Sequence, residues 1–333
     1  MIIDILLFLA GLALLVAGGN YLTDGAVAIA RRLGISNLMI GLTVVSIGSS
    51  MPDLVVCLTS TVTHKSTLAM GDVVGSDIID VLLVTGVMAI IRPFSIGDTL
   101  LRNGLPMLAI ATLALLFCGD NQLFGGAAAN GLSRAEGLVF LLFLIIFFRS
   151  NIEFAKRSGT IPAGAIRSRG KAAAEPDAPA PKPMSAWLAW LMLLGGLAAL
   201  VGGGNWVVKG ASAIALKAGM SESLVGLTVV AIGGAAPDMA ASIAALLKGK
   251  SDLAMGNIVG SCTLNIFGVL GVCSVVAPLQ SGDIGSIDFL TLAFGAIGLW
   301  LVSLLTPGHR LNRAVGIMLT VCYAGYMAYL VCR

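Results

Sequence analysis

Two stretches of clearly related sequence decide the fold of this chain. The first is GGNYLTDGAVAIARRLGISNLMIGLTVVSIGSSMPD at residues 18–53, and the second is GGNWVVKGASAIALKAGMSESLVGLTVVAIGGAAPD at residues 203–238. Their offset is 238 − 53 = 185, and the same offset relates the Ala-Met-Gly triplet at 69–71 to the one at 254–256. The chain therefore contains an internal repeat without gaps, which is a sign of a repeated structural unit.

The composition places both copies in a membrane. Of 333 residues, 57% are hydrophobic and only 11% are charged, and the mean hydropathy is +0.98. A soluble domain has about a quarter charged residues. This balance excludes a soluble enzyme, a nucleic-acid-binding protein and a disordered chain. The apolar runs are continuous rather than alternating, which favours helices over an outer-membrane barrel.

The sequence predicts an all-α polytopic membrane protein with ten transmembrane helices, since one span needs about 20 apolar residues. The N-terminal run lacks a basic region and a small-residue cleavage site, so we interpret it as the first span rather than a signal peptide. The polar, Pro/Ala-rich residues 150–185 form a linker between a first repeat, 1–149, and a second, 186–333. The expected spans are 2–30, 37–63, 68–91, 100–118, 132–149, 186–216, 222–247, 252–277, 287–306 and 311–332.

The basic residues orient these spans. With the N-terminus outside, the inner loops hold 15 of the 20 Lys and Arg residues. The positive-inside rule then places the linker 150–185 in the cytoplasm and both termini outside, in a plasma (inner) membrane. Five spans per half is an odd number, so the second half enters the membrane from the opposite face. The chain is expected to contain two inverted five-helix repeats, as secondary transporters do.

Two aspartates inside predicted spans are the first candidates for chemistry. Asp53 follows Gly-Ser-Ser-Met-Pro in span two, and Asp238 follows Gly-Gly-Ala-Ala-Pro in span seven. Proline interrupts a helix, so spans two and seven are expected to be broken here and to free carbonyl oxygens. An acid inside a span is costly and functional by default. The competing interpretation is a helix-capping carboxylate without a ligand.

Spans three and eight supply a second polar wall. Ser76 and Asp80 are four residues apart and share a helix face, and Ser261 and Asn265 do the same. GxxxG pairs at 71–75 and 256–260 let a neighbouring backbone come close to these faces.

Two further acids near this wall are less clear. Asp72 lies about one turn nearer the outer surface and is a candidate vestibule charge. Asp77 is one residue away from the face of Ser76 and Asp80, so its contact with an ion stays open.

The candidate ligands are hard oxygen donors, which suit Ca²⁺. The two histidines, His64 and His309, fall in expected loops, and the six cysteines lie mostly in apolar runs, so zinc or copper is not supported. No cofactor is expected. The donors are Asp53, Asp80, Asp238, Asn265, Ser49, Ser50, Ser76 and Ser261.

The chain resembles the cation/calcium exchanger superfamily, on its sodium/calcium exchanger branch. The resemblance is carried by GSSMPD at 48–53, GGAAPD at 233–238, GDVVGSDIID at 71–80 and GNIVGSCTLN at 256–265. It implies a ten-helix fold in which helices two, three, seven and eight form the ion-binding core. It also implies that the long helices one and six slide across that core.

The resemblance assigns roles to individual residues. Asp53 and Asp238 match the central Ca²⁺ ligands, and the backbone carbonyls of Ser46 and Ala231 match ligands for Na⁺. The remaining ligands matched by the family pattern are Ser49, Ser50, Ser76, Asp80, Ser261 and Asn265.

This chain also departs from the family pattern. Family members usually carry glutamate at the two central positions. Gly234 and Ala235 replace two hydroxyl ligands of the second repeat. At one further pair of equivalent positions, this chain has the acid in the first repeat (Asp80) and the amide in the second (Asn265), whereas some members have the reverse. The number of carboxylates is the same in both arrangements.

These features predict a secondary antiporter that exchanges Ca²⁺, or a related divalent cation, for Na⁺ by alternating access at a carboxylate site near the membrane midplane. Coupling to H⁺ or K⁺ and a cation channel are the alternatives. An intramembrane aspartyl protease lacks its expected sequence context here, so we expect no enzyme. The expected partners are inorganic cations and the lipid bilayer, and the chain is expected to act as a monomer.

Overall fold

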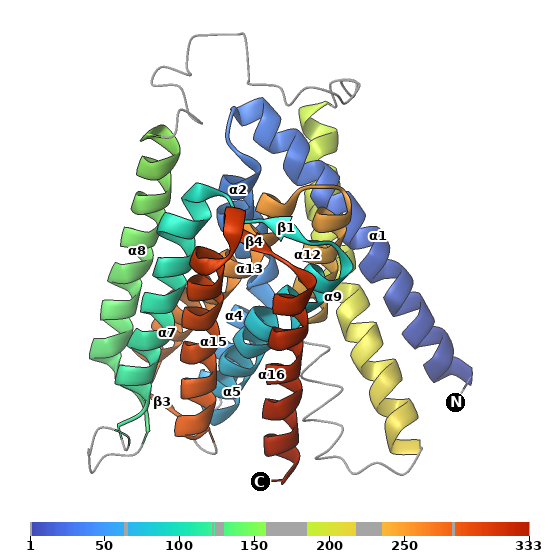
Figure 1. Ribbon diagram of the computed structural model, residues 1–333. Helices are drawn as coiled ribbons and strands as arrows, with labels where there is room; N and C mark the ends of the chain where they lie inside the picture. The colour runs from blue at the N-terminus through green and yellow to red at the C-terminus, as the bar shows by residue number, and fades with distance from the viewer. Residues whose placement is uncertain are drawn as a thin grey trace.

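Long helices running from one end of the molecule to the other dominate the computed structural model (Figure 1). The structure describes residues 2–62, 66–121, 123, 130–157, 185–217, 235–281 and 284–332. The start of α1 and the end of α16 lie at the lower end in Figure 1. The end of α8 and the start of α9 lie at the upper end. Each half of the chain therefore begins at one end of the bundle and finishes at the other.

The first half consists of helices joined by short connections. The elements are α1 (Ile2–Leu33), α2 (Asn37–Ile40), η1 (Gly41–Val45), α3 (Ser46–Ser49), α4 (Met51–Val62), α5 (Ser66–Ile78), η2 (Ile79–Val84), α6 (Thr85–Ile91), β1 (Phe94–Ser95), η3 (Leu100–Gly104), α7 (Leu105–Gly119), β2 (Gly131–Leu132) and α8 (Arg134–Arg157).

The second half repeats this order where it is described. Its elements are α9 (Ala186–Lys217), α12 (Ala236–Leu247), α13 (Ser251–Leu264), η5 (Asn265–Leu270), α14 (Gly271–Val276), β3 (Leu279–Gln280), α15 (Ser286–Leu305), η6 (Pro307–His309), β4 (Arg310–Leu311) and α16 (Arg313–Cys332).

The helical membrane fold expected from composition is confirmed. Within the described residues, 8 helices are long and apolar enough to cross a membrane, or 9 when the bent pair Asn37–Ser49 and Met51–Val62 counts as one span. The described part of expected span seven is α12, and residues 222–234 of that span lie outside the described residues. The total of ten spans therefore stays a prediction.

The first boundary of the linker differs from the expectation. Helix α8 continues to Arg157, eight residues beyond the expected end at 149 (157 − 149 = 8). The extension is mostly polar, and the side chains of Arg149 and Glu153 pair across one turn at 3.6 Å. Such i,i+4 pairs stabilise an exposed helix. The end of this helix therefore cannot be read from the end of the apolar run.

Helices α1 and α9 pack antiparallel through glycines spaced seven residues apart. A Cβ built on Gly18 would lie 2.9 Å from the Gly196 carbonyl oxygen, and one on Gly196 would lie 2.4 Å from the Leu22 nitrogen. Such distances leave no room for a side chain, because the neighbouring atoms belong to the backbone. The same close approach recurs along both helices at Gly11, Gly25, Gly203 and Gly210.

A leucine at this interface is expected to destabilise the protein. Gly196→Leu must push α1 away from α9, at a cost of about 1–3 kcal/mol for overpacking. The readout is the melting temperature of the purified protein in detergent. Gly195→Leu is the matched control, because Gly195 is exposed and no described atom lies within 4 Å of its Cβ. Equal melting temperatures for the two variants would contradict this packing.

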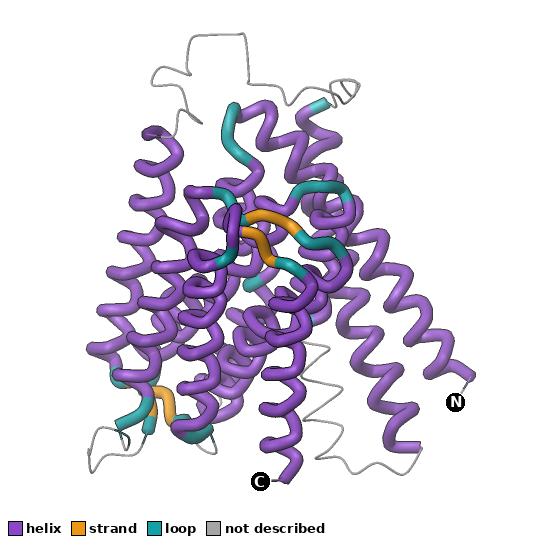
Figure 2. The backbone as a smooth tube through the Cα atoms, in the orientation of Figure 1, coloured by secondary structure: helices purple, strands orange, loops and turns teal. Residues whose placement is uncertain are grey.

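Two small antiparallel sheets link the halves at different levels of the bundle. Strand β1 pairs with β4, and β2 pairs with β3. Figure 2 shows the first pair in the upper part of the molecule and the other strands at its lower left. The repeat offset relates β1 to β3, since 94 + 185 = 279. Each sheet thus joins a strand following the third span of one half to a strand preceding the fifth span of the other.

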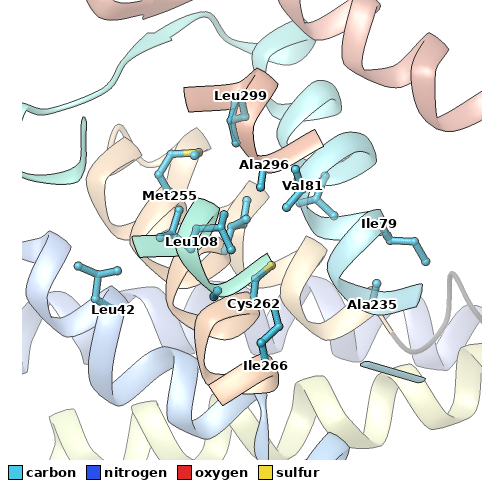
Figure 3. Close-up of a cluster of buried hydrophobic side chains, with 14 of the residues drawn as sticks. Leu42, Ile79, Val81, Leu108, Ala235, Met255, Cys262, Ile266, Ala296 and Leu299 are labelled. Atoms are coloured by element: carbon cyan, nitrogen blue, oxygen red, sulfur yellow. The ribbon is translucent and has the colours of Figure 1, made fainter. Parts of the chain in front are cut away.

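The centre of the molecule is formed by the third span of each half. The span Ser251–Val276 is 83% buried and Ala69–Ile91 is 67% buried, whereas α1, α8, α9 and α16 are below one third. Figure 3 shows side chains from α7, α13 and α15 gathered around Leu108, including Met255 and Ala296. These two central spans carry four of the predicted site residues, Ser76, Asp80, Ser261 and Asn265.

Candidate ion-binding site

The second span is broken where the sequence predicts it. Helix α3 ends at Ser49 and α4 begins at Met51, with a bend of 41° between the two parts. Pro52 has no N–H, so the carbonyl four residues earlier loses its helical partner. The break places Asp53 in the first turn of α4, where the partial positive charge of the helix N-terminus favours an anion.

The described part of the second repeat has the same start. Helix α12 begins at Ala236, with Pro237 near its first position and Asp238 in its first turn. The two aspartates therefore occupy equivalent positions at the N-termini of two helices. The half-helix that would precede α12 lies outside the described residues, so the break in span seven stays a prediction.

Asp238 is held by polar side chains of α13 and of the first repeat. It is 7% exposed. The Asn257 amide donates to its Oδ1 at 3.0 Å, and the Ser261 hydroxyl lies at the longer distance of 3.5 Å. Ser49 of α3 reaches this cluster, with 3.0 Å between its Oγ and that of Ser261 and 3.3 Å to the Asn257 Oδ1. One cluster thus joins both repeats.

Asp53 belongs to a second cluster, built around an amide. The Nδ2 of Asn265 donates to Asp53 Oδ2 at 3.0 Å and to Asp77 Oδ1 at 3.1 Å. A side-chain amide has two N–H donors, so it can hold two carboxylates at once. Asp77, which the sequence left open, is therefore part of the site, and its side chain is fully buried.

Asp80 lies between the two clusters. It is 1% exposed, and its carboxylate is close enough to interact electrostatically with those of Asp238, Asp77 and Asp53. Both of its carboxylate oxygens lack a hydrogen-bond partner among the described residues. Four carboxylates from both repeats therefore converge in the most buried part of the molecule.

Several buried oxygens around this point are unpaired within the described part of the chain. Buried polar atoms nearly always have a hydrogen-bond partner, and each exception requires an explanation such as an ion. The atoms concerned are Ser50 Oγ, Asp72 Oδ2, Asp77 Oδ2, Asp80 Oδ1, Asp80 Oδ2 and Asn265 Oδ1.

A π-helical backbone carries two of these side chains, those of Asp80 and Asn265. Asp80 lies in the first turn of the π-helix η2, and Asn265 begins the π-helix η5. The two positions are related by the repeat offset, since 80 + 185 = 265. Single π-helical turns occur frequently at functional sites, because they change the register of side chains along a helix.

The GxxxG expectation is confirmed for span eight. A Cβ on Gly256 would lie 2.9 Å from the Leu38 carbonyl oxygen, and one on Gly260 would lie 2.7 Å from Ser46 Oγ. Helix α13 therefore packs directly against the broken second span. For Gly75, no described atom lies within 4 Å, and the equivalent partner segment would be residues 222–234.

Two predicted ligands among the described residues make hydrogen bonds outside the two clusters. The Ser76 hydroxyl donates to the Val73 carbonyl at 3.1 Å on its own helix. The Ser46 carbonyl already accepts the Ser50 N–H at 3.0 Å and the Ser49 hydroxyl at 3.2 Å. Ala231 lies outside the described residues. No group of three or more His, Cys, Asp or Glu side chains in the described part is arranged to hold a metal ion, so a bound cation would also need hydroxyl, amide or carbonyl oxygens.

Sequence reasoning missed two residues of the Asp238 cluster. Asn257 donates to Asp238 and also to the Ser242 hydroxyl at 3.2 Å. The signal for Asn257 was present, because the repeat offset relates it to Asp72 (72 + 185 = 257). The same position thus holds an acid in the first repeat and an amide in the second.

Replacement of Asn257 tests whether this cluster matters. Asn257→Ala removes the donor that orients Asp238, and loss of such a supporting partner typically weakens metal binding by about 10–100-fold. We expect a rise of about that size in the Ca²⁺ concentration for half-maximal transport. Thr263→Ser is the control on the same helix, because Thr263 donates only to the Val259 carbonyl. Unchanged Ca²⁺ dependence in Asn257→Ala would remove Asn257 from the site.

Comparison with known proteins identifies the family of this chain. The family model described as sodium/calcium exchanger protein matches residues 3–151 and 188–332. The chain belongs to the sodium/calcium exchanger family. The putative antiporter CaxA of Alkalimonas amylolytica is 35% identical over 330 residues, which cover 98% of both chains. The inner membrane protein YrbG of Escherichia coli (strain K12) is 33% identical over 99% of this chain and 97% of its own.

A solved exchanger has the same fold. One structure of the sodium-calcium exchanger NCX_Mj superimposes with a TM-score of 0.80 at 26% identity, covering 98% of this chain and 99% of the other. The sodium/calcium exchanger MaX1 of Methanosarcina acetivorans is 29% identical over 98% of both chains. The family assignment made from the two repeats is therefore confirmed, and the chain is a membrane antiporter of this family.

Proposed function

We propose that this exchanger moves Ca²⁺ in exchange for Na⁺ by alternating access at one carboxylate site near the middle of the membrane. The observation that carries the proposal is the set of unpaired buried oxygens around Asp80, between the N-termini of α4 and α12. Carboxylate, amide and hydroxyl oxygens are the ligands that Ca²⁺ and Na⁺ accept. The relatives named as sodium/calcium exchangers support these two ions over H⁺ or K⁺ coupling and over a channel.

The charge of the site makes binding of the two ions mutually exclusive in this proposal. Two like charges about 4 Å apart repel by about 4 kcal/mol at an effective dielectric constant near 20. Asp53, Asp77, Asp80 and Asp238 therefore need positive charge, which one Ca²⁺ or several Na⁺ can supply. Exchange follows when only charge-compensated states change their access.

The antiparallel packing of the first helix of each half supports inverted repeats and alternating access. Helices α1 and α9, the first of each half, run antiparallel, as an inverted repeat requires. A Cβ on Gly19 of α1 would lie 2.7 Å from the Ala240 carbonyl oxygen of α12, so α1 also lies directly on a core helix. We infer that α1 and α9 slide as one unit over the core formed by spans two, three, seven and eight.

The ligand set that we propose keeps the sequence assignments and adds to them. The Gly234 and Ala235 side lacks hydroxyls, and the Asn257 amide and Ser261 hydroxyl lie next to Asp238 instead. Asp77 is added as a fourth carboxylate. We retain the other predicted ligands: Asp53, Asp80, Asn265, Ser49, Ser50 and Ser76, with the carbonyls of Ser46 and Ala231 for Na⁺.

Sidedness follows from the basic residues and from the ends of the bundle. We propose that the end where α8 finishes and α9 begins faces the cytoplasm, and that both termini face outward. The inner membrane location is supported by the description of the relative YrbG. We further propose ten spans, with α12 as the second half of the seventh, and a functional monomer.

The coupling ion is tested with purified wild-type protein in liposomes. Uptake of ⁴⁵Ca²⁺ is measured with outward gradients of Na⁺, K⁺ and H⁺ imposed one at a time. We expect uptake only with the Na⁺ gradient. Uptake driven by K⁺ or H⁺ alone would contradict the proposed counter-ion, and Ca²⁺ flux without any counter-ion would indicate a channel.

A further inference from the structure

A polar cavity away from the ion site lies where the β1–β4 sheet meets the turn between α12 and α13. Its volume is about 210 Å³, and its lining includes Arg92, Arg310, Ser95, Ser251 and Gly249. The lining residues include two arginines and no carboxylate. Nothing in the proposed exchange mechanism uses this cavity.

The two arginines converge on it from different elements. Arg310 is the register partner of Ser95 in the β1–β4 sheet. Arg92 follows α6, and its guanidinium reaches the carbonyl of Leu247 at the end of α12, at 3.4 Å. The ion pairs found among the described residues include neither guanidinium. Two guanidinium groups at one cavity are suited to a phosphate, which they bind through paired N–H donors.

The start of α13 adds to the positive potential of this cavity. Ser251 is the first residue of this 14-residue helix, and the N-cap residue Lys250 makes no side-chain hydrogen bond to the first turn. Uncapped N–H groups and the helix dipole favour an anion. The first turn of α13 also contains Asp252, whose carboxylate lies toward Gly97, where a Cβ would be 3.3 Å from its Oδ1, and Asp252 does not line the cavity.

The repeat provides an internal comparison. The equivalent corner at the other end of the bundle is formed by β2 and β3. There, Ala277 stands at the position of Arg92 (92 + 185 = 277), and Gly131 stands at the position of Arg310 in its strand pair. The fold therefore builds this corner without an arginine at either of these two positions, and Arg134 there donates to the Val276 carbonyl. The positive-inside rule explains basic residues on the proposed cytoplasmic side, but it does not require two of them to meet at one cavity.

The surroundings of the cavity indicate a membrane lipid as the source of the phosphate. Ile91 and Leu247, which adjoin Arg92 and the α12–α13 turn, are 43% and 58% exposed. Exposed apolar side chains beside a basic cavity match a phospholipid, whose chains are apolar and whose headgroup is anionic. The cytoplasmic leaflet, where the proposed sidedness places this cavity, is the anionic one.

We propose that this cavity binds the phosphate of an anionic phospholipid headgroup through Arg92, Arg310 and the start of α13. The bound headgroup joins β1, β4, α12 and α13, and α12 carries Asp238 in its first turn. The lipid therefore stabilises the position of a helix of the ion site without touching the ions.

The test measures lipid binding instead of transport, so its outcome is independent of the exchange proposal. Purified protein in detergent receives phosphatidylglycerol or cardiolipin, zwitterionic phosphatidylcholine, or inorganic phosphate, and the melting temperature is recorded. We expect a rise with the anionic lipids that exceeds the rise with phosphatidylcholine. The double variant Arg92→Gln/Arg310→Gln is expected to need about tenfold more anionic lipid, since charged hydrogen bonds are lost.

The matched control is Arg134→Gln at the opposite end. Arg134 also donates to a carbonyl at a helix end, that of Val276 at 3.2 Å, and it is expected to respond like wild type. The double variant Arg92→Lys/Arg310→Lys keeps both positive charges. It is expected to bind the anionic lipid more weakly than wild type, because lysine lacks the paired N–H donors of arginine. An equal lipid response in wild type and the Gln double variant would overturn the site. A rise in melting temperature with inorganic phosphate, without any rise with the anionic lipids, would show that the occupant of the cavity is not a lipid.

Discussion

Proteoliposomes carrying Asp238→Asn or Asp53→Asn are expected to lose Na⁺-driven Ca²⁺ uptake. Each aspartate lies in the first turn of a helix that begins at the centre of the molecule, and each is oriented by an amide from the opposite wall at 3.0 Å. An asparagine presents one oxygen and an NH₂ group toward the cation, which removes a charge and an acceptor together. Loss of a supporting partner already costs about 10–100-fold in metal affinity, so loss of a ligand should exceed about 100-fold.

A second buried aspartate provides the control for this experiment. Asp120 is fully buried at the end of α7, and its Oδ1 accepts the Leu123 N–H at 3.1 Å, far from the ion site in sequence and outside its clusters. Asp120→Asn is expected to transport at nearly the wild-type rate when it folds. Undiminished uptake in both Asp53→Asn and Asp238→Asn would remove the two central ligands from the account.

The second large effect is expected at Asn265. Its amide holds Asp53 and Asp77 at 3.0 and 3.1 Å. Asn265→Asp replaces two donors by a carboxylate, so three acids then face each other without compensation. Removing one partner of a buried charged contact is strongly destabilising, at about 3–5 kcal/mol. We expect transport to fall by more than about 100-fold, and the melting temperature to fall with it.

A compensating change distinguishes this cause from general damage. Asp77→Asn combined with Asn265→Asp keeps four carboxylates in the site and restores an amide between positions 77 and 265. The double variant is expected to regain folding and measurable transport. Pairing Asn265→Asp with Asp120→Asn gives the matched control, because it removes an acid elsewhere. Wild-type transport by Asn265→Asp alone, or equal rescue by both double variants, would show that the amide does not hold the two acids.

The repeat explains why so much of this molecule could be predicted. The offset located the acids after Pro52 and Pro237, and the structure places both in the first turn of a helix. The same offset paired Asp80 with Asn265, and the structure places each in the first turn of a π-helix. Helix type and the broken second span also followed from apolar length and proline, which act locally along the chain.

The contacts between helices could not be predicted in the same way. The contact of Asp77 with an ion stayed open because Asp77 is one residue away from Ser76. Residues three apart are also neighbours on a helix, so Asp77 lies near Asp80, and the structure shows its carboxylate bonded to Asn265. Asn257 was not among the predicted ligands, and only the structure places its amide beside Asp238. The end of α8 was missed because its last eight residues are mostly polar, and an apolar pattern does not report on such residues.

The packing partner of the glycines in α1 and α9 could not be predicted from the sequence either. Their spacing of seven in α1 and α9 is visible in the sequence, but the spacing alone does not name the partner helix. Only the structure shows Gly18 against Gly196 and Gly11 against Gly203. This contact supports the proposal that the two long helices move together.

The most direct test of the central claim is a titration of Ca²⁺ binding to the purified wild-type protein at increasing Na⁺ concentrations. If the same buried oxygens bind both ions, the apparent Kd for Ca²⁺ must rise continuously with Na⁺ and show no plateau. The number of Ca²⁺ ions bound at saturation must stay constant. A Ca²⁺ affinity that becomes independent of Na⁺ at high concentration would show that the two ions occupy separate sites, and would contradict the account.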